Sequence, residues 1–572
     1  MSSATLQDGK ILLRSVFEDK DFIRTIPGRR WIPEIKRWEL PLSVESYTEI
    51  LKIKDIQIDS KVILAVNEVR DQLHAVNAFK QTDGEVYPIE PMPIKTKPYR
   101  HQILGYNIGI TLDNSGLFME QGCGKTLSAI AIMGWRYKQE EIKRVLIVAP
   151  ASVLPVWISE LDKHADFEYE AECLEKSTAK RREFLKTWKY KDRLQIAIIN
   201  YEGVWRLIPY KADRKPKWRL DESVFSLSWR PDMIVCDESQ RIKSIKASQS
   251  KGMHKLAEIA KYRMILTGTP VTQTPLDLFS QFRFLDSSIF GTVYWNFRNQ
   301  YAVPIDYNGW KWEVPKSKIP LLAEKVNSIT YRITKKEALD LPETVDQELY
   351  CELEPKAMAQ YQEMKRESLM ELRSGEVVTA ANVLVRLLRL SQITGGYMKN
   401  SDERITCISE EKMKLLKATI DDIIGAGKKA VIFARFLPEI AAIRKLCDGD
   451  KKKKRDPIRY AWIAGEVKDR GSQVEMFQND PECMIFIAQI QTAGLGITLT
   501  AADIEIYYSL SYSFADYDQA RARIHRIGQV NKCTYMHLIA KGTIDEKVLK
   551  VLKNKKSVAD EVIDNWRDYF ED

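Results

Sequence analysis

The chain has 572 residues, of which 44% are hydrophobic and 29% are charged, and its formal net charge is +9. This ordinary globular composition excludes disordered, collagen-like and disulfide-scaffold proteins, and at roughly 150 residues per domain the length predicts about four domains. No stretch approaches 18 uninterrupted apolar residues, so the sequence also excludes a membrane span.

The eight cysteines are far apart in the sequence and form no Cys-x-x-Cys pair. Scattered thiols are typical of a reducing compartment and argue against a zinc site or a disulfide framework. The first twenty residues lack the apolar core of a secretory signal. We therefore expect an intracellular protein, cytoplasmic if its source is prokaryotic or viral.

Residues 1–92 differ in character from the rest and end in the breaker Pro88-Ile89-Glu90-Pro91-Met92-Pro93. Four large side chains predict a small β-rich core here: Trp31, Trp38, Leu40 and Leu42. The stretch 20–38 has six basic and two acidic residues, a net charge of +4. Five of its basic residues are candidate phosphate contacts: Arg24, Arg29, Arg30, Lys36 and Arg37.

Four apolar runs bounded by turn residues follow within 93–274, and stretches such as 126–139 between them have helical spacing. The runs are 145–150, 194–200, 233–238 and 264–270. Their apolar residues are consecutive, as in parallel strands that are covered on both faces. This pattern predicts a doubly wound α/β block.

A second α/β block is predicted within 411–572, where five more runs of the same kind occur. These runs are 429–435, 459–465, 484–489, 505–511 and 533–539. Between the two blocks, residues 275–410 are helix-rich, with helical patterns at 358–375 and 380–393. The sequence thus predicts two α/β blocks separated by a largely helical segment.

A basic stretch from Lys176 to Arg219 has 14 Lys and Arg against 4 Asp and Glu, a net charge of +10. It also contains Trp188, Trp205 and Trp218. Basic residues with interleaved aromatics suit a phosphate backbone, and the alternative is a solvated helix and loop. A second basic run, Lys451–Arg455, is expected to be an exposed loop.

The segment Gly122-Cys123-Gly124-Lys125-Thr126 opens a predicted helix. Its glycines let backbone N–H groups close around phosphates, and a helix N-terminus adds partial positive charge. In this pattern Lys125 reaches the β- and γ-phosphates and Thr126 ligates magnesium. Met119 stands where the general pattern has a further glycine.

Two further groups complete a candidate active site. Asp237 and Glu238 end a predicted strand, where a carboxylate pair can hold magnesium and polarise an attacking water. Arg523 and Arg526 lie three residues apart on a predicted helix, so both guanidinium groups can face one target. Such charged forks suit the transition state of γ-phosphate transfer, although a surface ion-pair patch is the alternative.

Taken in order, the motifs resemble those of a known family. They are YRHQ (99–102), GCGKT, VAPASVLPVWISEL, INYE, DESQRIKS, LTGTPVTQTPLDLF, AVIFARF, QTAGLGITLTAAD and QARARIHRIGQ. This order resembles the superfamily 2 motor ATPases, specifically the Swi/Snf-type branch of double-stranded DNA translocases, over roughly 95–555. The most branch-specific parts are RxHRIGQ, the run from LTGTP into PLDLF, and LPETVDQELYCELEPKAMAQY.

The resemblance implies two RecA-like lobes, at 93–274 and 411–572, with ATP in the cleft between them. It also implies helical protrusions and an inter-lobe linker at 275–410, and a C-terminal helical segment.

The resemblance implies roles for the nucleotide-site residues. Gln102 reads adenine, and Gly122, Gly124, Lys125 and Thr126 bind phosphate and magnesium. Asp237 holds the metal, Glu238 is the catalytic base, and Arg523 and Arg526 are arginine fingers. It further implies coupling roles: Thr267 and Thr269 link hydrolysis to DNA, and Gly494, Gly496 and Thr500 couple the second lobe. Gln240 replaces the histidine usual in the branch, and Glu120-Gln121 the usual acidic-Met pair.

Residues 1–92 are similar to the HARP-type domain that accompanies annealing helicases of this branch. The implied protein is a monomeric DNA-dependent ATPase that uses ATP and magnesium, translocates along double-stranded DNA, and remodels or anneals forked DNA. A strand-separating helicase and a non-catalytic DNA-binding scaffold are the alternatives. Protein partners and the biological pathway stay open.

Overall fold

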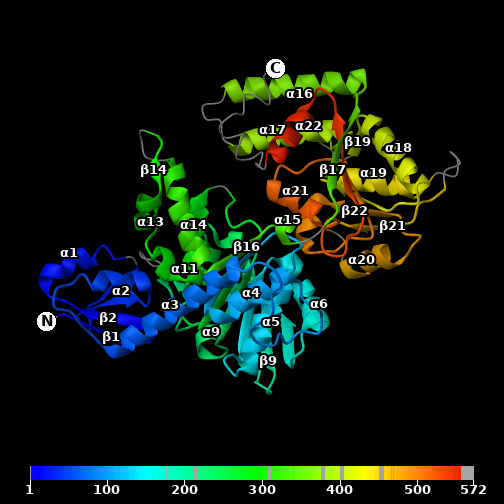
Figure 1. Cartoon of the computed structure of the whole chain (residues 1–572). Coiled ribbons are helices and arrows are strands. Elements are labelled where there is room, and N and C mark those ends of the chain that lie inside the picture. Colours follow the sequence, from blue (N-terminus) through cyan, green and yellow to red (C-terminus); the bar gives the residue numbers. More distant parts are fainter. Residues whose placement is uncertain are drawn as a thin grey trace. The chain divides into compact units, whose positions relative to one another are not determined.

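The computed structural model describes residues 2–554 apart from short gaps. The gaps are 27, 175–176, 212–216, 273, 307–310, 339–340, 375–379, 400–404, 450–455, 466 and 468. The chain folds into two compact units, residues 1–338 and residues 339–572 (Figure 1). The basic run Lys451–Arg455 and the end of the expected C-terminal segment, 555–572, lie outside the described residues.

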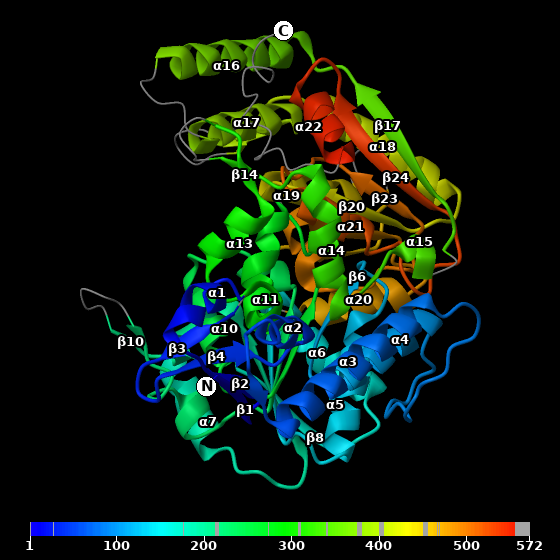
Figure 2. The same cartoon turned by 60° about the vertical axis from the view of Figure 1, so that its left-hand side comes forward.

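The N-terminal part of the first unit is a small sheet in the order β3-β4-β2-β1-β5. Its strands are β1 (Ser3–Gln7), β2 (Lys10–Arg14), β3 (Arg30–Ile32), β4 (Arg37–Pro41) and β5 (Gln57–Ile58). The helices α1 (Lys20–Ile23), α2 (Val44–Ile50) and α3 (Ser60–Gln81) accompany it. Helix α3 leads away from this sheet and packs on α4 and α14 of the same unit (Figure 2).

The expected β-rich core of this region is present, but Trp31 is not part of it. Leu40 is fully buried and Trp38 packs against the core cluster. Trp31 is 44% exposed, because it lies on the edge strand β3, which has a neighbouring strand on one side. It pairs with Trp38 across the two strands, and the ring centroids are 5.1 Å apart.

Lobe 1 is built on a seven-stranded sheet in the order β16-β6-β13-β12-β7-β9-β8, and all of its strand pairs are parallel. The predicted strands are confirmed as β7 (Arg144–Ala149), β9 (Leu194–Asn200), β12 (Met233–Asp237) and β13 (Tyr262–Leu266). The sheet also contains β6 (Asn114–Met119), β8 (Tyr169–Cys173) and β16 (Thr330–Ile333). Consecutive buried residues fill the central strands, as expected for a sheet covered on both faces.

Helices connect these strands and continue into a protrusion. The connecting helices are α4 (Arg100–Thr111), α5 (Lys125–Lys138), α6 (Leu154–His164), α7 (Thr178–Thr187), α8 (Tyr201–Val204), α9 (Val224–Leu227) and α10 (Ser248–Leu256). The elements after β13 are α11 (Leu278–Leu285), α12 (Ser287–Phe290), α13 (Tyr294–Tyr301), the hairpin β14 (Val303–Pro304) and β15 (Trp312–Glu313), α14 (Ile319–Ser328) and α15 (Lys335–Ala338). Strand β16, which lies within the expected segment 275–410, therefore belongs to the sheet of lobe 1.

Lobe 2 has a second parallel sheet, in the order β17-β24-β23-β20-β22-β21. Its strands are β17 (Thr344–Cys351), β20 (Ala430–Ala434), β21 (Tyr460–Ile463), β22 (Ile485–Gln489), β23 (Ile504–Tyr507) and β24 (Cys533–Ala540). The helices are α16 (Pro355–Ser374), α17 (Ala380–Thr394), α18 (Glu411–Gly425), α19 (Leu437–Cys447), α20 (Arg470–Asn479), α21 (Phe514–Arg521) and α22 (Ile544–Lys553), and β18 (Tyr397–Lys399) pairs with β19 (Ile405–Cys407). The predicted fold class, two doubly wound α/β lobes with helical insertions and a small N-terminal part, is confirmed.

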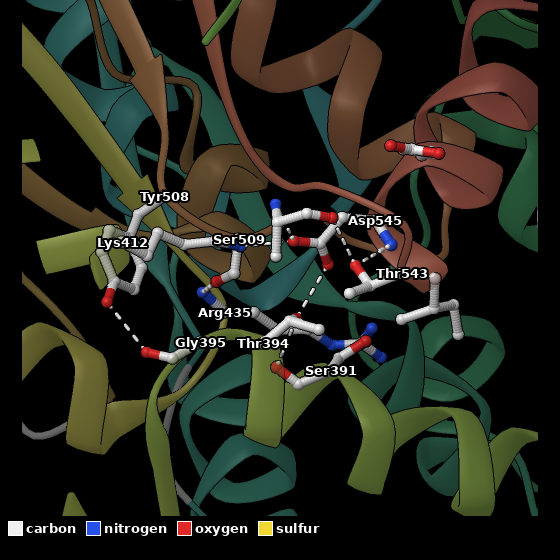
Figure 3. A network of polar contacts seen from close by, with 12 residues as sticks. Ser391, Thr394, Gly395, Lys412, Arg435, Tyr508, Ser509, Thr543 and Asp545 are labelled. Atoms are coloured by element: carbon white, nitrogen blue, oxygen red, sulfur yellow. Dashed lines mark hydrogen bonds and ion pairs between the residues drawn. The ribbon is translucent and has the colours of Figure 1, made fainter. Parts of the chain in front are cut away.

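A buried polar network joins α17 to the rest of lobe 2 (Figure 3). Lys412 at the start of α18 is 1% exposed and forms an ion pair with Asp545 of α22. The other oxygen of Asp545 accepts a hydrogen bond from Thr394 Oγ1 at 2.9 Å, and Tyr508 OH donates to the Gly395 carbonyl at 2.8 Å. These bonds hold the helix before residue 410 within the second unit.

Within the part of the chain that the structure describes, no helix is both long enough and apolar enough to cross a membrane.

Candidate active site

The phosphate-binding loop lies between the end of β6 and the start of α5. Gly122 and Gly124 have φ of +89° and +79°, in the left-handed region that favours glycine. Gly124 is the N-cap of α5, so Lys125 and Thr126 begin the helix at the end with partial positive charge. Lys125 Nζ donates a hydrogen bond to the Met119 carbonyl at 2.9 Å. The backbone conformation of the loop is therefore that of an anion-binding site, and the side chain of Lys125 reaches back to the end of β6.

Two buried side chains of helix α4 form hydrogen bonds with this loop. Gln102 is 2% exposed, and its Nε2 donates to the Cys123 carbonyl at 3.2 Å while its Oε1 accepts from Tyr99 N at 2.9 Å. His101 Nε2 donates to the same Cys123 carbonyl at 2.7 Å, and burial lowers the pKa of His101. Gln102 therefore caps its own helix with one end of its amide and holds the loop with the other.

The acidic pair lies at the carboxyl end of β12. Trp157 Nε1 donates to Asp237 Oδ2 at 3.0 Å, and the Glu238 backbone N–H donates to Oδ1 at 3.0 Å. Burial raises the pKa of Asp237, and the charge of Glu238 raises it further. The positive charge of Lys125 acts in the opposite direction and lowers the pKa of the same carboxyl group.

Glu238 is held by side-chain amides on both carboxylate oxygens. Gln240 Nε2 donates to Oε2 at 2.6 Å, and Gln121 Nε2 lies 3.5 Å from Oε1. Gln240 Oε1 in turn accepts from Thr267 Oγ1 at 2.7 Å, and the Thr269 N–H donates to Thr267 Oγ1 at 3.0 Å. A chain of hydrogen bonds therefore connects Glu238 to the LTGTP segment after β13.

The residues proposed for magnesium fit that ion in chemistry. The Thr126 hydroxyl and the Asp237 carboxylate are oxygen ligands, which magnesium prefers. Among the described residues no cluster of three or more His, Cys, Asp or Glu side chains could hold a metal. Magnesium at nucleotide sites takes one or two protein oxygens besides phosphates and waters.

In the second unit, Arg523 and Arg526 are not on a helix, contrary to the prediction. Helix α21 ends at Arg521, and both arginines follow it, Arg523 in a turn and Arg526 in a bend. The reason is tertiary: the Arg523 carbonyl accepts from Leu499 N at 3.0 Å instead of continuing the helix. The two side chains still converge, because Nη1 of each donates to the Ile497 carbonyl, at 3.4 and 3.3 Å.

The segment that these arginines contact contains the residues proposed to couple lobe 2. Gly494 lies in the short helix η8 (Ile490–Leu495), and Gly496 caps it with φ of +70°. Thr500 Oγ1 accepts from Gln478 at 3.3 Å, and its carbonyl accepts from Gln529 at 3.4 Å. Hydrogen bonds therefore connect the segment 494–500 to the segment after α21 that contains Arg523, Arg526 and Gln529.

The basic stretch 176–219, apart from residues 176 and 212–216, which lie outside the described residues, divides into structural and exposed residues. Trp188 is 8% exposed and stacks on Trp229, with ring centroids 5.8 Å apart, so it belongs to the core. Arg181 Nε donates to the Leu174 carbonyl and is part of the fold. Lys180 on the same helix, α7, is exposed and Arg182 is half-buried, so these two remain candidates for phosphate contacts.

Sequence reasoning missed the supporting side chains around Asp237. Trp157 and Tyr201 lie within quoted motifs, VAPASVLPVWISEL and INYE, but nothing in their residue type assigned them a role. Tyr201 OH donates to the Asp237 carbonyl and is fully buried. For Tyr201 the available signal was a polar aromatic residue directly after an apolar strand, since a buried hydroxyl needs an acceptor. Trp157 lies within helix α6 and had no such signal.

Comparison with known proteins matches both units. Residues 99–396 match the model of the SNF2-related domain, and residues 411–528 match the helicase conserved C-terminal domain. An "Uncharacterized ATP-dependent helicase" of Mycoplasma pneumoniae is 26% identical over 456 residues, which cover 79% of this chain and 40% of that protein. The "DNA annealing helicase and endonuclease ZRANB3" of Mus musculus is 28% identical over 458 residues, covering 77% of this chain and 38% of that protein.

A solved structure, "Sulfolobus solfataricus SWI2/SNF2 ATPase core in complex with dsDNA", is 26% identical with a TM-score of 0.38, and the match covers 84% of this chain and 95% of that one. The chain spans about 40% of the length of the two curated relatives above.

Proposed function

Because the chain belongs to the SNF2-related family, we propose that it is a DNA-dependent ATPase that translocates along double-stranded DNA. The observation that supports this most directly is the meeting of three motifs at one end of the lobe 1 sheet. The charge of Lys125 in the phosphate loop acts on the Asp237 carboxyl group, and Glu238 is bonded through Gln240 to Thr267 of LTGTP. Ligands of parallel α/β sheets bind at this carboxyl end of the strands.

Each part has a proposed role in hydrolysis of ATP. Gly122, Gly124 and Lys125 bind the phosphates, and Thr126 and Asp237 hold magnesium, which offsets phosphate charge. Glu238 orients the attacking water and accepts its proton. Arg523 and Arg526 stabilise the transition state, and Gln102 reads adenine in addition to the support it gives the loop.

The proposed substrate is duplex DNA, with forked DNA as a preferred form. The name of the ZRANB3 relative includes annealing of DNA, and the N-terminal sheet has a local excess of basic residues at 20–38. Arg24, Arg30 and Lys36 are exposed there. Arg29 and Arg37 are half-buried, and Nη1 of each donates a hydrogen bond, to the Ile26 carbonyl and to Thr5 Oγ1. We place the protein inside the cell, as a monomer whose protein partners are open.

The test is the ATPase rate with no nucleic acid, single strands, duplex and forked DNA. Stimulation by duplex, and more by forks, is expected, and equal rates in all four would contradict the proposal. Unwinding assays on forked and blunt duplexes separate translocation from strand separation. Reversal of Arg24, Arg30 and Lys36 to Glu should remove the preference for forks but keep the rate on plain duplex. Charge reversal is preferable to removal of residues 1–92, because removal would also take away α3, which packs on α4.

A further inference from the structure

A cavity of about 640 Å³ lies within the first unit, between the N-terminal sheet and the protrusion of lobe 1. Arg24, Arg29 and Trp38 line it from the N-terminal side, and Asn296, Asn299 and Gln300 line it from α13. Its volume falls within the roughly 300–1,000 Å³ of small-molecule sites.

Two glycines bring the walls of this cavity together. Gly28 and Gly291 have φ of +74° and +75°, which favours glycine at both positions. A side chain at Gly291 would meet the backbone nitrogen of Gly28 at 3.2 Å. The loop before β3 and the C-cap of α12 thus approach each other closely, backbone against backbone, where both line the cavity.

The lining is complementary to an anion that carries a flat ring. Among the residues that the structure describes, two arginines and no carboxylate line the cavity. Burial, with the nearby charge of Arg24, lowers the pKa of Arg29, so a bound anion would favour the charged form of both arginines.

 Trp38 supplies an aromatic face, and the three exposed amides on α13 can each donate and accept hydrogen bonds. Phosphate-binding cations, a stacking ring and base-reading amides are the groups that single-stranded nucleic acid requires.

We propose that this cavity binds an unpaired nucleotide of single-stranded DNA, at the point where a strand leaves the duplex. Arg24 and Arg29 contact its phosphates, Trp38 stacks on the base, and the amides of α13 contact the base edge. The inference rests on the proposed function, since a translocase on forked DNA meets such a strand. It also assigns junction recognition to the N-terminal sheet and the protrusion together, rather than to residues 1–92 alone.

The test uses the full-length chain without ATP and an oligothymidine of about ten nucleotides, a length within the usual range of single-strand sites. The variant Asn296→Asp/Asn299→Asp places two negative charges on exposed positions of the cavity wall and leaves side-chain shape unchanged. We expect it to bind the oligonucleotide about tenfold more weakly or worse, the loss typical of one stacking or charged contact. The control Asn67→Asp/Gln81→Glu adds the same charge on exposed positions of α3 outside the cavity and should bind like the parent.

Two further measurements identify the ligand. Replacing Arg24 by Gln should lower the salt dependence of oligonucleotide binding by about 0.7 in the log–log slope. A forked duplex with 2-aminopurine in its single strand should lose fluorescence on binding to the parent, through stacking, and lose less on binding to the aspartate variant. Free thymidine monophosphate that bound as tightly as the oligonucleotide would overturn the assignment to a DNA strand.

The outcomes also separate this inference from the proposed function. If the aspartate variant and the parent bind the oligonucleotide equally while duplex DNA stimulates ATP hydrolysis in both, the cavity assignment is wrong and the motor assignment stands. If oligonucleotide binding falls in the variant but no DNA stimulates hydrolysis in the parent, the cavity assignment stands and the motor assignment is wrong.

Discussion

Gln240 donates a hydrogen bond from its amide to the carboxylate of Glu238, with 2.6 Å between Nε2 and Oε2. The other end of the same amide accepts from Thr267 Oγ1 at 2.7 Å. An amide can bridge a carboxylate and a hydroxyl in this way because it has a donor and an acceptor at opposite ends. The orientation of the proposed catalytic base is therefore linked to the LTGTP segment.

The substitution Gln240→Ala should lower kcat for DNA-stimulated ATP hydrolysis by about 100-fold, because Glu238 loses the contact that positions it. KM for ATP should change little, since no phosphate contact is removed. Steady-state ATPase assays check both constants. Gln240→His, which restores the residue usual in the branch, should recover part of kcat; a rise in KM at constant kcat would contradict the positioning role.

Lys125→Ala and Glu238→Gln should both abolish hydrolysis but differ in nucleotide binding. Loss of Lys125 removes a phosphate contact, so the affinity for ATP should fall. Glu238→Gln keeps the loop intact and loses only activation of water, so it should bind ATP and retain it. Equilibrium binding of a fluorescent ATP analogue separates the two variants, and near-parental turnover in Glu238→Gln would reject the assignment as base.

Replacing either Arg523 or Arg526 by Ala should lower DNA-stimulated turnover by about a thousandfold, as loss of an arginine finger typically does. Duplex affinity should stay within a few fold of the parent, because these side chains are proposed to face ATP rather than DNA. Fluorescence anisotropy with labelled duplex measures that affinity. A collapse of duplex binding would instead make the two arginines DNA-binding residues.

The sequence predicted the strands and the order of the motifs well, because buried parallel strands have consecutive apolar residues and few alternatives. It failed where tertiary hydrogen bonds decide the local structure. The turn at Arg523 depends on a backbone bond to Leu499, which no local pattern contains. Trp31 was expected in the core, and its exposure follows from the edge position of β3, which depends on the order of the strands.

Neutralising Lys180 and Arg182 to Gln should flatten the salt dependence of duplex binding. Each phosphate contact contributes about 0.9 to the log–log slope for duplex DNA, so the double variant should lose up to about 1.8. Arg181 is left in place because it bonds to the Leu174 carbonyl and supports the fold. Binding is measured over a range of salt concentrations, and an unchanged slope would show that α7 is a solvated face without DNA contacts.

Glu439 on α19 should make the stability of the second unit depend on pH near neutrality. Its side chain is 1% exposed, and burial raises its pKa to about 7. Hydrogen bonds from Ser509 and from the backbone N–H groups of Phe436 and Arg435 oppose this rise only in part, as does the charge of Lys412. A carboxyl group in the unfolded chain keeps its ordinary pKa near 4.5.

The folded state therefore binds more protons than the unfolded state between about pH 4.5 and 7, and the contribution of Glu439 to stability falls as the pH rises through that window. The total loss is at most about 3 kcal/mol, and above about pH 7 the contribution is level. Glu439→Gln cannot ionise, so it should lack this part of the pH dependence. Calorimetric unfolding of the full chain between pH 5 and pH 8 should show the Tm of Glu439→Gln rising relative to the parent by about 5 °C or more, whereas parallel curves would show that the buried carboxyl group stays in one protonation state throughout.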